Sequence, residues 1–186
     1  MLEDMDGKID GIVDGGPCAV GVESTIIDLT CTPPRLLRPG GITLEQLREV
    51  LGEVAVDPAV TRLMGEGEKP RAPGMKYRHY APKAPVTVVQ GAPAAAARYI
   101  QDHMAPGDGV ICFDEYAGLF DGHPLEQLGP STDVPEQARR VFDALRWFDG
   151  TDVQQIWAQC PEAVGIGLAV ANRLNKAAGF HIVQAE

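Results

Sequence analysis

Between residues 56 and 82 the sequence loses its hydrophobic periodicity, and this break constrains the fold more than any other feature. Glycine and proline interrupt the stretch at Gly65, Gly67, Pro70, Pro73, Gly74 and Pro82. A connection of about 25 residues without secondary structure of its own is unusual inside a compact domain. We therefore expect an N-terminal part (residues 1–60), a linker (residues 61–84) and a C-terminal domain (residues 85–186).

The C-terminal domain alternates between short apolar runs and helical patterns. The runs at residues 86–89 and 109–113 indicate buried strands. Apolar residues at helical spacing predict helices over residues 93–104 and 134–148. Strands that alternate with helices favour a small parallel sheet covered on both faces, which is a three-layer α/β fold.

Two further segments follow in this domain. Residues 153–157 are expected to extend a helical region or to start another helix. A last helix is expected over residues 168–178, with basic residues near its end that suit the helix dipole and with Gly179 as its stop. For Asn172 and Arg173 we expect helix packing or a surface position rather than ligand contact.

The N-terminal part has a β pattern. We expect a short strand over residues 9–13, a longer strand over residues 20–29 and a return strand over residues 35–38. A helix follows, capped by Thr43 with Gln46 three residues on, which is the spacing of a capping box.

Charge and composition exclude several classes of protein. The formal net charge of −10 argues against a general nucleic-acid binder, because phosphate contacts need clustered lysines and arginines. Residues 69–83, however, hold five basic side chains and no acidic one, which fits either an anion contact or a solvated linker. No run of about 18 apolar residues and no signal-peptide pattern occurs, so we expect a cytoplasmic protein without a membrane span. The scattered cysteines lack zinc spacing, so we expect reduced thiols and no metal site.

Residues 14–41 combine features of an anion site. Two adjacent glycines near the start allow a ligand to approach the backbone closely. Glu23, Ser24 and Thr25 are polar residues in an otherwise apolar strand, and buried polar groups need a partner from the protein or from a ligand. Arg38 on the return strand can bind a phosphate through a forked pair of hydrogen bonds. The alternative is that Ser24 and Thr25 face solvent on an edge strand.

Five segments carry a family resemblance: DGG at residues 14–16, GVESTIID at 21–28, LRPG at 37–40, APGMKYRHYAP at 72–82 and GLAVANRLNKAA at 167–178. The first three resemble the second half of a YrdC-type domain. The fourth resembles the linker of the long form of this family, and the fifth resembles the closing segment of its second domain. From end to end, the chain is similar to the two-domain L-threonylcarbamoyladenylate synthase family.

The resemblance implies an α/β protein in three parts: a C-terminal remnant of a YrdC-like domain, an extended linker and a small Rossmann-like parallel three-layer domain. It implies a nucleotidyltransferase that makes threonylcarbamoyl-AMP and pyrophosphate from L-threonine, bicarbonate and ATP, with Mg²⁺ on the phosphates. The product serves the threonylcarbamoyladenosine modification of tRNA, which the enzyme reaches indirectly through threonylcarbamoyl-transferase proteins.

Site residues carry over where the motifs match. Ser24 corresponds to a serine that contacts threonine, and Arg38 corresponds to an arginine on the nucleotide phosphates. Tyr80 is the first choice for a tyrosine that contacts the nucleotide, and Tyr77 is the second. No catalytic side chain is assigned, because the proposed chemistry needs no side-chain nucleophile.

Two motifs of the family are not found where they are expected. A Lys-x-Arg motif and a Ser-x-x-Asn motif bind ATP and threonine in the family, but the Lys-x-Arg of this chain lies at residues 76–78, inside the linker. Ser24 and Ser131 have no asparagine three residues on. We therefore expect residues 1–60 to supply one wall of the pocket, with the front of the catalytic domain missing.

Two other functions stay open. The chain is alternatively a non-catalytic module that regulates the linker or docks the transferase partner, which the missing motifs favour. Carbamoyl-adenylate chemistry, as in hydrogenase-maturation relatives with a YrdC-like domain, is a third possibility. The linker motif and the trailing α/β domain argue against that third possibility.

Overall fold

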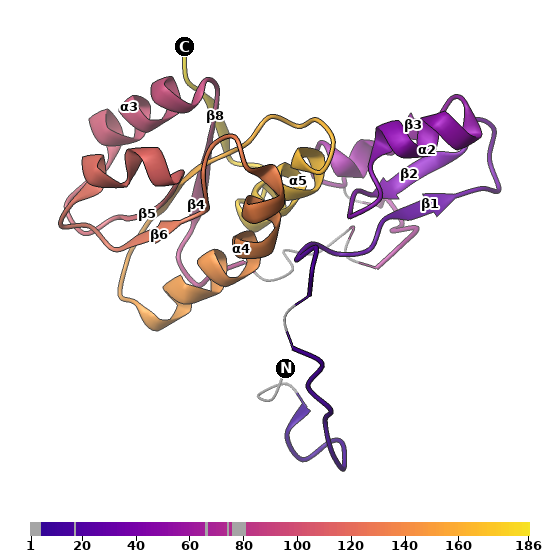
Figure 1. Cartoon of the computed structure of the whole chain (residues 1–186), viewed down its shortest axis with the longest axis horizontal. Helices are drawn as coiled ribbons and strands as arrows, with labels where there is room; N and C mark the ends of the chain where they lie inside the picture. The colour runs from indigo at the N-terminus through magenta and orange to yellow at the C-terminus, as the bar shows by residue number, and fades with distance from the viewer. Residues whose placement is uncertain (1–4, 17, 66, 74, 76–80) are drawn as a thin grey trace.

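The computed structural model describes residues 5–16, 18–65, 67–73, 75 and 81–186. Two α/β units lie side by side, one built on a three-stranded sheet and the other on a five-stranded sheet (Figure 1). Residues 5–16 extend away from both units (Figure 1).

The five-stranded sheet forms the centre of the C-terminal domain, and its neighbouring strands run parallel. In the spatial order β6-β5-β7-β4-β8, the strands are β4 (Val86–Gln90), β5 (Gly109–Cys112), β6 (Leu125–Gln127), β7 (Ile156–Gln159) and β8 (Ile182–Gln184). The central strands are buried because helices cover both faces of the sheet. The strands predicted at residues 86–89 and 109–113 are confirmed as β4 and β5.

Helices form the two outer layers. One face carries α3 (Pro93–His103) with a 3-10 helix (Asp114–Phe120), and the other carries α4 (Val134–Trp147) with α5 (Gly167–Ala177) (Figure 1). The predicted parallel three-layer α/β fold is therefore confirmed.

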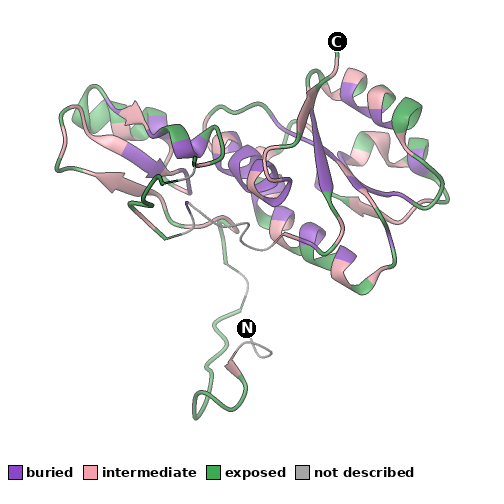
Figure 2. Cartoon of the chain, turned by 180° about the vertical axis from the view of Figure 1, so that it is seen from behind, coloured by how far each residue is buried: buried purple, intermediate pink, exposed green. Residues whose placement is uncertain are grey.

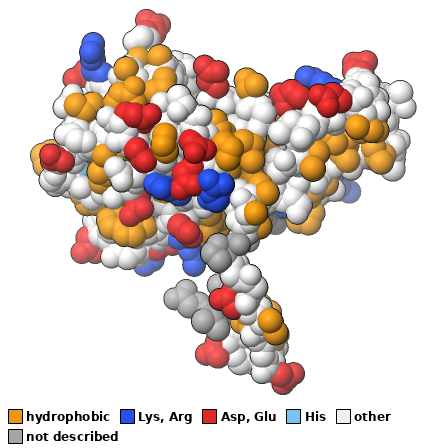
Figure 3. Space-filling view, in the orientation of Figure 1, with side chains coloured by type: hydrophobic (Ala, Val, Ile, Leu, Met, Phe, Trp, Pro, Cys, Tyr) orange, Lys and Arg blue, Asp and Glu red, His pale blue; other side chains and the backbone are white. Residues whose placement is uncertain are grey.

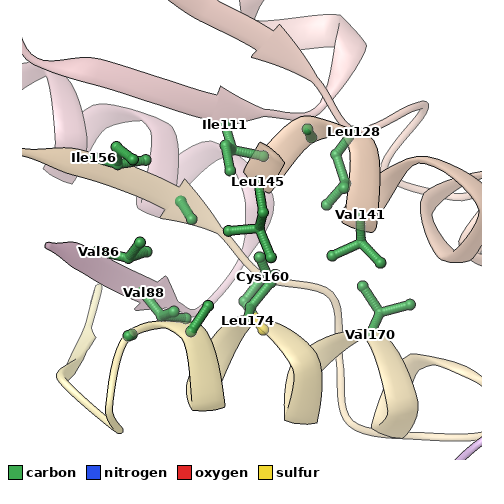
Figure 4. Close-up of a cluster of buried hydrophobic side chains, with 14 of the residues drawn as sticks. Val86, Val88, Ile111, Leu128, Val141, Leu145, Ile156, Cys160, Val170 and Leu174 are labelled. Atoms are coloured by element: carbon green, nitrogen blue, oxygen red, sulfur yellow. The ribbon is translucent and has the colours of Figure 1, made fainter. Parts of the chain in front are cut away.

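Strand β4 shows how the two faces of the sheet are filled. Val88 points into the core that α4 and α5 close, where Leu145 and Leu174 are fully buried (Figure 4). Val89, the next residue, belongs to the separate core on the α3 side, with Ile100. Successive side chains of a strand point to opposite faces, so β4 contributes to both cores.

The prediction of helix at residues 153–157 was wrong, because strand β7 begins at Ile156. A four-residue apolar run has no period that separates a buried strand from a helix, and here pairing with both β4 and β5 decides the outcome. The short strands β6 and β8 were not predicted either. The last helix was predicted correctly, and Gly179 follows its end with φ of 59°.

The smaller unit consists of three strands and one helix. These are β1 (Ile26–Asp28), β2 (Arg35–Arg38), α2 (Leu44–Leu51) and β3 (Ala55–Val56). Strand β2 lies in the middle, antiparallel to β1 and parallel to β3. The predicted return strand is therefore β2. The capping box is also confirmed, since Thr43 Oγ1 accepts from the Gln46 amide and the Gln46 side chain accepts from the Thr43 amide.

Two predictions for the N-terminal part were wrong. Residues 9–13 form no strand, and Val13 is 97% exposed (Figure 2). The strand expected over residues 20–29 is reduced to Ile26–Asp28. The segment before it leaves the sheet because Gly21, at φ of 77°, packs directly against the backbone of α4.

The linker is attached to the fold at Met75 and at Lys83. Met75 is 6% exposed and packs with Leu37 and Ala59 behind β2. At the other end, the Lys83 amide donates to Asp149 Oδ1 at 3.1 Å, and Lys83 Nζ donates to the Asp149 carbonyl at 3.1 Å. Among the described residues, no helix combines the length and the apolar character that a membrane span requires.

Candidate anion-binding site

Two of the predicted site residues, Ser24 and Arg38, lie side by side. Arg38 Nε donates a hydrogen bond of 2.9 Å to the carbonyl oxygen of Ser24. Arg38 is half-buried at the end of β2, while Ser24 is exposed just before β1. The bond uses the Nε atom, and among the described residues no hydrogen bond occupies the two terminal nitrogens of the guanidinium group. This arrangement suits an anion, because the two terminal nitrogens can bind neighbouring oxygens at the same time.

Gly40 allows the two motif segments to touch. A Cβ atom at this position would overlap the carbonyl oxygen of Glu23 and crowd the Thr25 amide, 2.5 Å away. The backbone of the LRPG turn therefore lies directly against the backbone of residues 23–25. A glycine is needed here for close approach rather than for an unusual φ angle.

Thr25 has a structural role. Its hydroxyl donates to the Ile42 carbonyl at 2.6 Å and accepts from the Ile42 amide at 3.0 Å. The protein itself thus satisfies this polar group, which removes Thr25 from the set of candidate ligand contacts. Ser24, in contrast, is exposed, which agrees with the solvent-facing alternative for that residue and also leaves it accessible to a ligand.

Helix α5 brings a buried arginine to the same strand segment. Arg173 is 5% exposed, and its Nη1 atom lies 2.6 Å from Glu23 Oε1. Its guanidinium carbon is also 4.8 Å from the ring centroid of Phe142 on α4. From the sequence, Arg173 was expected to pack on the helix or to lie at the surface, and its contact with Glu23 was missed. Glu23 and Arg173 are 150 positions apart, so no local pattern could have joined them.

Lys176 follows one turn later on α5 and adds charge to this junction. Burial is the main cause that lowers the pKa of its ammonium group, and the nearby cations Arg38 and Arg173 lower it further. Glu23 acts in the opposite direction and raises the pKa. The junction therefore gathers cations from both units around one carboxylate, which is an environment that attracts anions.

Further contacts hold α5 against the smaller unit. Asn172 is 6% exposed, and its Nδ2 donates to the Val60 carbonyl at 2.6 Å. Leu168 packs on the small core formed by Leu36, Leu44 and Val54. Because Leu36 and Arg38 lie two positions apart on β2, they point to the same face, and this is the face that α5 covers.

A second group of cations lies on the other side of β2. Arg35, Arg62 and Lys69 line a surface cavity of about 250 Å³ beside the linker. Two of these cations already have partners, since Arg62 binds Glu68 at 2.7 Å and Arg35 lies 3.7 Å from Asp57. Arg62 lowers the pKa of Glu68 to about 2 through this hydrogen-bonded pair. With Arg71, four cations and two carboxylates line this cavity, so its positive charge is neutralised only in part.

The middle of the linker contacts β1. Arg71 Nη1 lies 3.6 Å from Asp28 Oδ2, at the end of β1. Hydrogen bonds from Thr30 lower the pKa of the Asp28 carboxyl. The predicted nucleotide contacts Tyr80 and Tyr77 lie outside the described residues. Within the described part of the chain, no group of three or more His, Cys, Asp or Glu side chains could hold a metal ion.

Comparison with known proteins agrees with this architecture. The family profile described as "Threonylcarbamoyl-AMP synthase, C-terminal domain" matches residues 42–179, and the profile described as "Telomere recombination" matches residues 1–40. The chain is 43% identical to a threonylcarbamoyl-AMP synthase of Bacillus subtilis and 46% identical to one of Pyrococcus abyssi. Each alignment covers 99% of this chain, but 53% and 54% of the two relatives, so the chain spans about half of their length.

A solved structure supports the same assignment. The crystal structure of P. abyssi Sua5 complexed with L-threonine superposes with a TM-score of 0.87 at 43% identity. The alignment covers 100% of this chain and 54% of the archaeal chain. The fold, the matched segments and the profile over residues 42–179 all lead to one conclusion: this chain belongs to the threonylcarbamoyl-AMP synthase C-terminal domain family.

Proposed function

We propose that this chain supplies the phosphate-binding wall of a threonylcarbamoyl-AMP synthase. The observation that carries the proposal is the direct contact between the EST and LRPG segments, where Arg38 Nε binds the Ser24 carbonyl and Gly40 permits the approach. Similarity over the whole chain to synthases of two organisms supports it. The established relatives are about twice as long, so the remaining walls of the site are assigned to sequence outside this chain.

The proposed reaction joins two anions. The amine nitrogen of threonine bonds to the carbon of bicarbonate, water leaves, and a carbamate results. A carbamate oxygen then attacks the α-phosphorus of ATP, the bond to the β-phosphate oxygen breaks, and pyrophosphate leaves with the electron pair. Cations must offset the charge that gathers at phosphorus, and this requirement gives the chain its role.

Ser24 and Arg38 take different parts in this scheme. Arg38 binds the nucleotide phosphates through its terminal nitrogens, with a permanent charge and a planar fork. Ser24 contacts the threonine part of the ligand through its exposed hydroxyl. The hydrogen bond from Arg38 Nε to the Ser24 carbonyl sets the spacing between the two halves of the mixed anhydride. Tyr80 and Tyr77 stay predictions as nucleotide contacts.

Magnesium belongs to the proposal as a companion of ATP. Mg²⁺ is commonly held by substrate phosphates with one or two carboxylates, and it would neutralise phosphate charge here. The described residues offer no metal-binding cluster of their own, so no step is assigned to a protein-held ion. The further partners that we propose are the threonylcarbamoyl-transferase proteins, through which the product reaches tRNA in the cytoplasm.

Reconstitution tests this function. The purified 186-residue chain is incubated with ATP, L-threonine, bicarbonate and Mg²⁺, alone and with the N-terminal half of the B. subtilis synthase, and threonylcarbamoyl-AMP is sought by mass spectrometry. We expect product in the mixture and its loss when Arg38 is replaced by Met. If the two parts form a complex without making product, the synthase assignment fails.

The second candidate is a supporting module without catalytic residues. The packing of α5 favours it, because Leu168 and Asn172 hold this helix against the smaller unit and give the C-terminal domain a supporting contact. In that case the C-terminal domain would stimulate a complete synthase or bind the transferase partner, and Arg38→Met would leave that stimulation unchanged. The reconstitution experiment separates the two candidates through this variant.

A further inference from the structure

The contact between Glu23 and Arg173 crosses the boundary between the two units. Arg173 is almost completely buried, whereas the Glu23 side chain keeps 37% of its surface exposed. Burying a guanidinium group is costly unless a charged partner compensates it. The buried Arg173 therefore holds the half-exposed Glu23 carboxylate in place.

Glu23 lies next to the proposed phosphate site. It directly precedes Ser24, whose carbonyl oxygen binds Arg38 Nε, and the Glu23 carbonyl lies against Gly40. The Glu23 carboxylate raises the pKa of Lys176 and the Arg38 guanidinium lowers it, so these charges lie at one junction. Besides Lys176, two arginines are possible partners of this carboxylate: Arg173 on α5, which contacts it at 2.6 Å, and Arg38 on β2, which is bonded to the next residue of the strand.

The two partners have opposite consequences for an anionic ligand. While Arg173 holds Glu23, the terminal nitrogens of Arg38 remain open to phosphate. If the carboxylate turned to Arg38, it would occupy those nitrogens and repel the phosphates of ATP. The C-terminal domain thus controls a competitor of the ligand, although its contact is with the glutamate and not with the site.

We propose that Arg173 is a positioning residue for the phosphate site: by holding the Glu23 carboxylate, it keeps Arg38 available to the nucleotide. This inference rests on the proposed function, and it gives the C-terminal domain a defined task in that function. Lys176, one turn further along α5, adds positive charge to the same face.

Binding measurements on the full 186-residue chain test this role. Isothermal titration with Mg²⁺-ATP, and with inorganic pyrophosphate as a phosphate-only probe, is carried out on wild type, Arg173→Met and the double variant Arg173→Met/Glu23→Gln. We expect Arg173→Met to weaken both affinities roughly tenfold, because a charged competitor is released. The double variant should recover to within about threefold of wild type, because a glutamine amide does not neutralise Arg38.

Two further variants guard against a merely structural explanation. Asn172→Ala removes the bond to Val60 from the same helix without touching Glu23, and it should leave both affinities unchanged. Arg173→Lys keeps the charge and should stay within about threefold of wild type. Circular dichroism confirms that each variant is folded. Equal losses in Asn172→Ala and Arg173→Met, or no recovery in the double variant, would overturn the proposal.

A readout without nucleotide separates this inference from the proposed function. In chain labelled with ¹⁵N-arginine, NMR follows hydrogen exchange at the Arg38 guanidinium. We expect slower exchange in Arg173→Met, because Glu23 then pairs with Arg38, and a return to the wild-type rate in the double variant. Unchanged exchange would contradict the inference even if wild type binds ATP. Changed exchange in a chain that binds no ATP would support the contact and sink the nucleotide role.

Discussion

The two α/β units of this chain differ in how they are stabilised. The C-terminal domain closes a core on each face of its sheet, and residues such as Leu145, Ile156 and Leu174 are completely buried in one of them. The smaller unit has two small cores, and each of them takes a residue from elsewhere in the chain. Leu168 of α5 completes one core, and Met75 of the linker completes the other.

This difference separates stability from ligand contact. The larger domain has ample buried apolar surface, and the charged side chains just beyond strand β5 are paired with one another: Asp114 lies 3.8 Å from Arg140, which also binds Glu136. The smaller unit carries Ser24 and Arg38, yet it depends on α5 and on the linker for packing. Hydrophobic side chains reach the surface of both units (Figure 3), and on the smaller unit the exposed ones include Leu29, Ile42 and Val50.

Removing core volume from the larger domain should have the largest effect. Leu145→Ala is expected to destabilise it by about 2–5 kcal/mol, since the truncation leaves a cavity between the sheet and α4. Urea unfolding followed by tryptophan fluorescence measures this domain alone, because Trp147 and Trp157 both belong to it.

A matched truncation in the smaller unit tests whether the two units unfold separately. Leu36→Ala empties the core of that unit and should leave the tryptophan-detected midpoint nearly unchanged, whereas Val50→Ala, at an 84% exposed position, should alter stability by less than about 0.5 kcal/mol. If Leu36→Ala lowered the tryptophan midpoint as much as Leu145→Ala, the two units would unfold as one, and the contrast would be wrong.

The next effect concerns the contact between the two motif segments. Gly40→Ala places a methyl group against the Glu23 carbonyl and should cost about 1–3 kcal/mol through forced backbone movement. The same variant should lose ATP binding, because Arg38 and Ser24 move apart. Gly150→Ala is the control, since a Cβ there meets nothing within 4 Å. If Gly40→Ala bound ATP with wild-type affinity, the contact between the two motif segments would not be needed for the site.

Replacing the arginine of the site should have a smaller and more specific effect. Arg38→Lys keeps the positive charge and loses the fork, so ATP affinity should fall by roughly 1–3 kcal/mol, the scale of a charged hydrogen bond. Titration calorimetry measures the affinity, and the urea midpoint should not move. Equal affinity for the two proteins would remove Arg38 from the phosphate site.

The smallest expected effect is the order in which the cysteine thiols react, and it is measured on the unaltered folded protein. Burial raises the pKa of the Cys112 and Cys160 thiols to about 12, so both stay protonated at pH 8. Hydrogen bonds from the Val20 and Gly21 amides lower the pKa of the exposed Cys18 thiol, which favours the reactive thiolate. Ellman's reagent should therefore modify Cys18 first in the folded protein. Reaction at Cys160 before Cys18 would contradict the described burial.

Sequence reasoning reached the parts of this structure that local pattern determines. Strands β4 and β5 and helix α4 are periodic or strongly apolar, and the capping box at Thr43 follows from two residues three positions apart. Strand β7 was missed because its identity depends on pairing with β4 and β5 on either side. Residues 9–13 look like a strand in isolation, but a strand also requires a neighbour.

The site divides in the same way. Ser24 and Arg38 were found because short motifs contain them, and their separation of 14 residues is bridged by one hairpin-like pair, β1 and β2. The partner of Glu23 could not be found in this way, since Arg173 lies in a helix whose pattern indicates packing. Contacts between units depend on how finished units dock, and local periodicity carries no information about docking.

The most direct test of the account is where a phosphate chain binds. We would titrate the ¹⁵N-labelled 186-residue chain with inorganic pyrophosphate and follow the amide shifts by NMR. We expect saturable shifts at residues 23–25 and 38–40 and in the last turn of α5. Shifts confined to the cavity beside the linker, around Arg62 and Lys69, would contradict it and move the anion site to the other side of β2.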